Sequence, residues 1–164
     1  EYFKMTTFDL AITKDNKVIA WLNPTPKPRE KKQLYYLPLK PGEIKQLCYK
    51  RLSSSDILIH LLTDKGIQYI RLTATGDEED FTTRHIDELK VLNIDQISCA
   101  GSYLRALING RLHKQTGRGF VPDIDIKHVK EFQVCPSLNI EIGILTKDRF
   151  YVYRSGRCMK EMVI

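Results

Sequence analysis

The chain has 164 residues, 42% of them hydrophobic and 28% charged, which is the composition of a folded globular protein and not of a disordered one. Its formal net charge of +6 favours acidic or nucleic-acid partners. The sequence contains no run of about 20 apolar residues, so we expect no membrane-spanning helix, and no signal-peptide pattern opens it.

Four times along the chain, two short apolar runs flank a polar tip. Runs rich in Val, Ile, Leu and Tyr that are broken by turn residues predict β-hairpins. These pairs of runs cover residues 9–21, 57–70, 103–112 and 140–153. A unit that recurs at this spacing indicates a repeat architecture, because one hairpin alone cannot bury its apolar face.

A basic, proline-rich segment follows the first hairpin. Three prolines within residues 24–28 disfavour both a helix and a central strand there. The segment carries four basic side chains, which are Lys27, Arg29, Lys31 and Lys32. We interpret it either as a surface loop between strands or as an arm that contacts phosphates or an acidic partner.

An alternating strand that ends in cysteine precedes each of the last three hairpins. These strands cover residues 44–48, 94–99 and 129–135, and their cysteines are Cys48, Cys99 and Cys135. We expect the three to occupy one equivalent buried position, as thiols that pack like small hydrophobic residues. Since the sequence also lacks a glycosylation sequon, we expect a reducing, intracellular compartment, either nucleus or cytosol.

Two further turns carry charge. The first holds four consecutive carboxylates, which are Asp77, Glu78, Glu79 and Asp80. It lacks the spaced ligands of a calcium loop, so we interpret it as a solvated turn. The residues 84–89 that follow are compatible with one helical turn. The second is the turn at residues 116–119, which exposes Arg118.

The third repeat resembles, in divergent form, the repeat of the regulator of chromosome condensation family. That pattern joins an alternating strand ending in cysteine, a strand of small and apolar residues, a turn with glycine and a strand that ends near an aromatic residue. Residues 97–113 follow it best, and residues 15–21 match its segment from turn to tryptophan. The resemblance implies a β-propeller whose members act as scaffolds, as ubiquitin-ligase modules, or as guanine-nucleotide exchange factors on chromatin.

The sequence shows no catalytic signature. The four histidines lie far apart, none of them in a zinc-binding spacing, and there is no phosphate loop and no nucleophile elbow. His60 lies inside an apolar strand, where we expect a core or interface residue. We therefore predict no enzymatic activity, no cofactor and no metal.

These observations predict an all-β fold of repeated antiparallel hairpins that forms part of a β-propeller, or alternatively a small β-sandwich or barrel. We expect one domain over residues 1–164 with about four repeats (1–23, 34–75, 90–120 and 126–156), which further chain segments or another subunit would close. The predicted function is a non-catalytic protein-interaction module or scaffold that binds through its loops. The candidate contact residues are Lys27, Arg29, Lys31 and Lys32 of the basic segment, Asp77, Glu78, Glu79 and Asp80 of the acidic turn, and Arg118. Binding of nucleic acid or chromatin through residues 27–32, and guanine-nucleotide exchange by analogy with the family, are the alternatives.

Overall fold

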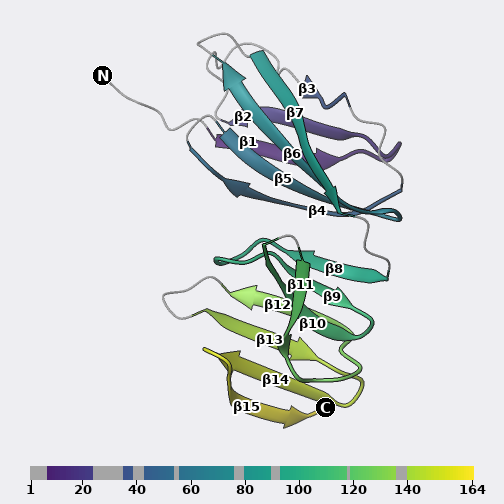
Figure 1. The fold of residues 1–164 in the computed structure, drawn as a ribbon, viewed down its shortest axis with the longest axis vertical. Coiled ribbons are helices and arrows are strands. Elements are labelled where there is room, and N and C mark those ends of the chain that lie inside the picture. Colours follow the sequence, from purple (N-terminus) through teal and green to yellow (C-terminus); the bar gives the residue numbers. More distant parts are fainter. Residues whose placement is uncertain are drawn as a thin grey trace. The chain divides into compact units, whose positions relative to one another are not determined.

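A computed structural model describes residues 7–23, 35–38, 43–53, 56–75, 80–89, 93–117, 119–135 and 140–164 (Figure 1). All regular structure in these ranges is antiparallel β-strand, which confirms the all-β prediction. The described parts of the chain include no helix with the length and hydropathy needed to span a bilayer. The chain divides into two compact units, Glu1–Leu89 and Lys90–Ile164.

The first unit contains two sheets. One joins β1 (Thr7–Ile12), β2 (Val18–Asn23) and β3 (Tyr35–Tyr36) in chain order. The other joins β4 (Ile44–Arg51), β5 (Asp56–Thr63), β6 (Gly66–Thr75) and β7 (Asp80–Leu89), again in chain order. Each strand therefore pairs with its neighbour in sequence, which is the simplest way for short turns to build a sheet.

The two sheets of the first unit share an apolar core. Val18 and Ala20 of β2, with Leu37 directly after β3, pack with alternate residues of β5 and β6, which are Ile57, Ile59, Leu61, Ile70 and Leu72. A backbone-to-side-chain bond joins the sheets as well. Asn16, at the tip of the β1–β2 hairpin with φ of 65°, accepts a hydrogen bond of 2.9 Å on its Oδ1 from the Ile44 amide at the start of β4.

The second unit repeats this plan with two four-stranded sheets. The first holds β8 (Ile94–Ser98), β9 (Arg105–Ile108), β10 (Arg111–Thr116) and β11 (Gly119–Ile124). The second holds β12 (Glu131–Cys135), β13 (Glu141–Leu145), β14 (Arg149–Arg154) and β15 (Arg157–Val163). Their shared core is made of Leu107, Leu112, Ile124, Val129, Phe132, Val134, Ile142 and Ile144.

Gln96 joins the two sheets of the second unit through hydrogen bonds. β12 is an edge strand, so half of its backbone groups point away from β13. The Gln96 Nε2 donates to the Phe132 carbonyl at 2.6 Å, and its Oε1 accepts from the Phe132 amide at 3.1 Å. The tip of the β9–β10 hairpin adds a third bond, from the Val129 amide to the Gly110 carbonyl at 2.8 Å.

The pairing of strands shows which residues of the repeats are equivalent. The pairing of β4 with β5 shifts in register between Ile44 and Gln46, and the pairing of β8 with β9 shifts at the corresponding place, between Ile94 and Gln96. Each glutamine then pairs with the second-last residue of the next strand, Leu62 or Leu107. In the last sheet Glu131 pairs with Leu145. The Thr146 amide donates to the Arg149 carbonyl at 2.9 Å and so adds one more pair to this hairpin, which makes Leu145 the second-last residue before the turn.

On this alignment the cysteines are not equivalent, so the expectation of one shared buried position is wrong. Cys48 lies two residues beyond Gln46 and Cys135 lies four beyond Glu131, whereas Cys99 lies three beyond Gln96 and outside β8. Their burial differs too, since Cys135 is exposed while the other two are half-buried. The repeat rests on the strand pairing and not on the thiols.

The interpretation of residues 84–89 as a helical turn is also wrong, because they belong to strand β7. That strand pairs with β6 along its whole length, from Asp80 opposite Thr75 to Leu89 opposite Ile67. The sequence predicted three strands for each repeat, but the three four-stranded sheets each have a fourth, which is β7, β11 or β15.

We predict that Gln96→Ala lowers the free energy of unfolding by about 2 kcal/mol, because it leaves the amide and carbonyl of Phe132 without their partner. Urea unfolding followed by circular dichroism measures the change. Gln133→Ala, at an exposed position on β12, is the matched control and should leave the stability nearly unchanged. Equal effects of the two substitutions would contradict the role assigned to Gln96.

Candidate functional site

Most residues that the sequence suggested for binding lie outside the described residues. This holds for the basic segment with Lys27, Arg29, Lys31 and Lys32, for Asp77, Glu78 and Glu79 of the acidic turn, and for Arg118. Asp80 is described through its backbone alone, as the first residue of β7. The candidate surface below therefore comes from other residues.

The face of the β12–β15 sheet that points away from the core of the second unit is apolar. We call it the outer face. Along β12, β13 and β14 the residues alternate, so that Phe132, Ile142 and Tyr151 contact the core while the residues between them point outward. A groove of about 380 Å³ runs over these outward residues, which are Glu131, Gln133, Cys135, Glu141, Gly143, Leu145, Phe150 and Val152, together with the edge of Phe132.

Phe150 forms the apolar centre of this groove. Its ring lies over Gly143 on the neighbouring strand, where an added Cβ would stand 3.3 Å from the ring. On its other side Phe150 pairs with Met162 of β15, a side chain that is 41% exposed. The glycine thus lets the aromatic ring lie flat across the sheet, and the surface is wide and shallow.

Ion pairs border the apolar centre. Arg154 binds Glu141 across β13 and β14, with the Nε at 3.1 Å from the carboxylate, and Arg149 binds Glu161 across β14 and β15. Because these charges are already paired, a partner that covers the groove does not have to neutralise them. Glu131 carries the remaining charge of the groove lining.

The cysteines differ in chemical state as well as in position. Cys135 and Cys158 are free and exposed, so the expectation of thiols holds for them. Cys135 lines the groove, whereas Cys158 pairs with Tyr153, whose side chain contacts the core. Cys48 and Cys99, by contrast, are each disulfide-bonded, which corrects the expectation of thiols at these two positions.

The β1–β3 sheet of the first unit has an apolar outward face of its own. Val18 and Ala20 are buried in the core, so Ile19 between them points the other way. Tyr36 pairs with Ile19 and is 53% exposed. The Lys17 ammonium lies 5.9 Å from the centre of the Tyr36 ring, a cation–π contact at the border of this face.

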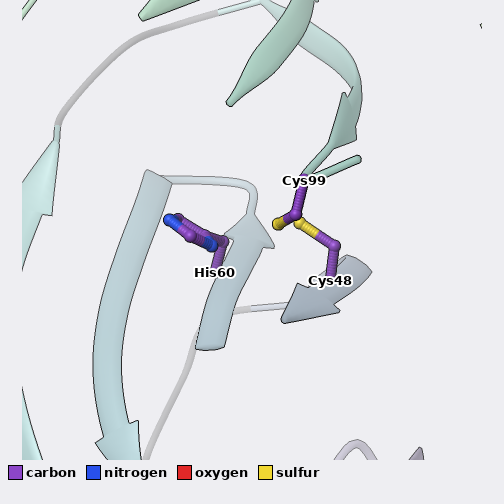
Figure 2. A group of neighbouring side chains, drawn as sticks. All are labelled: Cys48, His60 and Cys99. Atoms are coloured by element: carbon purple, nitrogen blue, oxygen red, sulfur yellow. The ribbon is translucent and has the colours of Figure 1, made fainter. Parts of the chain in front are cut away.

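His60 is a buried strand residue, as the sequence predicted. Figure 2 shows it on β5, next to the strand β4 that carries Cys48, its direct partner in the ladder. The imidazole meets the Tyr69 ring edge-on at 5.0 Å. Burial lowers the pKa of His60 to about 4, and the nearby positive charge of Lys50 contributes further. The ring is therefore neutral at physiological pH.

No family model matches the chain, and a search of curated proteins finds no match either. The proposals that follow therefore depend on the residues and geometry alone.

We predict that acid destabilises the first unit through His60. The folded pKa of about 4 lies below the unfolded value of about 6.5, so only the unfolded state takes up a proton between these values. Stability is therefore full above pH of about 6.5 and falls by roughly 3 kcal/mol as the pH drops to about 4.

The fluorescence of Trp21, the chain's single tryptophan, reports unfolding of this unit. His60→Gln should flatten the pH dependence of the unfolding midpoint, and His113→Gln in the second unit should leave it as it is. An unchanged slope in His60→Gln would show that other groups cause the acid sensitivity.

Proposed function

We propose that the chain is a non-catalytic interaction module in which stacked sheets form blades of a β-propeller. Three features support the blades. The described sheets follow one another in chain order, and each pairs its strands in sequence. Within each unit a hairpin tip also bonds to the start of the next sheet, at Ile44 of β4 in the first unit and at Val129, two residues before β12, in the second. This is the pattern of a repeat whose units contact only their neighbours.

The observation that carries the proposal is the contrast between the two faces of the β12–β15 sheet. One face is buried by β8–β11, with Phe132 and Ile144 almost fully covered. The outer face presents Leu145, Phe150 and Val152 in the same alternation, yet no described element of the second unit covers them. These three side chains are half-buried and line one groove, and a contiguous apolar groove of this kind is typical of an interaction site.

The partner that we propose for this face is a second copy of the chain, docked through the outward face of its β1–β3 sheet. That face offers Ile19 and Tyr36, an aliphatic and an aromatic side chain that can pack on the shallow groove around Phe150. Because the two surfaces differ, the contact is head-to-tail, and it builds a ring or a filament and not a closed two-fold dimer.

We predict that Phe150→Glu abolishes concentration-dependent self-association, because it places a charge in the apolar centre of the contact. Sedimentation velocity of the full chain over a wide concentration range measures this. Val121→Glu, which adds the same charge at an exposed apolar position on β11, is the matched control and should associate like the wild type.

The two free thiols locate the contact. In the associated state Cys135 should react several-fold more slowly with an alkylating reagent than in Phe150→Glu, while Cys158 should react at the same rate in both. A chain that stays monomeric at every concentration, or equal protection of the two thiols, would overturn the assignment of this face.

A further inference from the structure

A second cavity lies inside the second unit, between its two sheets. It measures about 320 Å³ and is lined by Arg105, Asp123 and Ile124 from the first sheet and by Ile140, Ile142, Tyr153, Ser155 and Gly156 from the region of the second. Its volume is at the lower end of the range for small-molecule sites. It is separate from the groove around Phe150, with which it shares no lining residue.

Arg105 is the unusual feature of this cavity, because it is a charged side chain with only 7% of its surface exposed. Its Nε donates to Asp123 at 3.1 Å, and its Nη1 donates to the Ala100 carbonyl at 3.4 Å. Among the described residues the Nη2 nitrogen has no acceptor. Arg105 is one of the residues that line the cavity, so its guanidinium borders the space in which a molecule can bind.

Gly101 makes room for this arrangement. Its φ of 84° suits glycine, and an added Cβ would stand 3.0 Å from the Ile140 side chain and 3.5 Å from the Arg105 Nη1. The close approach of the loop holds the guanidinium in place from one side, while Asp123 holds it from the other. Arg105 is thus fixed before any ligand arrives, which lowers the entropy cost of binding.

The charges around the guanidinium do not cancel. Lys114 reaches Asp123 from the other side, with its Nζ at 4.0 Å from Oδ1 and at 5.0 Å from the centre of the Tyr103 ring. The cluster therefore joins two cations to one carboxylate. An excess positive charge at a mostly buried position favours the binding of one monovalent anion.

The other lining residues indicate which kind of chemical group the cavity can hold beside the anion. Ile124, Ile140 and Ile142 give the cavity an apolar wall, and Tyr153 adds an aromatic one. A phosphate dianion carries more negative charge than the single excess positive charge of this cluster, whereas a monocarboxylate matches that charge and pairs well with a guanidinium.

We propose that this cavity binds a small monocarboxylate with an apolar body. The carboxylate accepts hydrogen bonds from the Arg105 Nη2, and the body packs against Ile124, Ile140 and Ile142. This site is independent of the interaction module, and the two proposals can fail separately.

Benzoate is the probe for this site, and benzamide is its neutral control. Isothermal titration of the full chain measures affinity, and the Nε–Hε signals in ¹⁵N-resolved NMR identify the arginine that responds. We expect benzoate to bind saturably and to shift the signal of one arginine. That signal should be missing from the spectrum of Arg105→Gln, which assigns it to Arg105. Benzamide should bind about tenfold more weakly or not at all.

Variants separate the site from general charge effects. Arg105→Gln should weaken benzoate binding about tenfold or more, and the exposed substitution Arg111→Gln, which removes the same charge, should leave it unchanged. Asp123→Asn should bind at least as tightly as the wild type, because it removes the competing carboxylate. Ile140→Phe, which keeps the ion pair and fills the cavity, should block binding.

Circular dichroism establishes that each variant is folded, and Asp123→Asn and Ile140→Phe keep the proposal testable if Arg105→Gln unfolds. Equal affinity for benzoate and benzamide, the absence of saturable binding, or weaker binding by Asp123→Asn would overturn it. Phe150→Glu should bind benzoate like the wild type, so that loss of self-association and loss of the carboxylate site are told apart.

Discussion

A small antiparallel sheet has two faces, and the need to cover both of them determines how this chain is built. Within each unit one sheet covers a face of the next, and the cores around Ile59 and Phe132 are the result. Side-chain and tip-to-strand bonds then fix the position of one sheet on its neighbour, through Asn16 in the first unit and Gln96 in the second. Apolar contact alone is not directional, whereas these bonds are.

The sequence predicted the parts of the fold that carry strong alternation. The hairpins formed by β5 with β6 and by β13 with β14 are rich in Ile, Leu and Tyr, and they are found where the pattern placed them. The fourth strands were missed because they lie at sheet edges, and β11 and β15 show no regular alternation of buried and exposed residues. β15 is exposed along its whole length, so nothing in its residue order distinguishes it from a loop. The cysteines misled because each one ends an alternating run. Counted from the equivalent residues Gln46, Gln96 and Glu131, however, they lie two, three and four residues further on.

The candidate sites were less accessible to sequence reasoning than the fold. The groove depends on Gly143 lying under Phe150, a contact between strands whose register is known only once the hairpin is built. The Arg105 cavity unites residues from the starts of β9 and β13 with residues from the ends of β11 and β14. A signal was nevertheless present, because Arg105 interrupts an otherwise small and apolar run. An arginine inside such a strand needs a carboxylate, and Asp123 with its alternating neighbours was the available one.

The β12–β15 sheet has Glu131 at the position that Gln96 occupies in the β8–β11 sheet. This difference changes the hydrogen bonds that the side chain can make to a strand packed against it. An amide side chain both donates and accepts, so it can hold the amide and the carbonyl of a facing strand together. A carboxylate only accepts, and whatever strand lies against Glu131 finds no donor there for its carbonyl. The Gln96 side chain therefore makes two hydrogen bonds to the facing strand, whereas the Glu131 side chain offers only acceptors. The proposed contact at the outer face thus depends more on apolar packing, and less on hydrogen bonds at this position, than the contact inside the second unit.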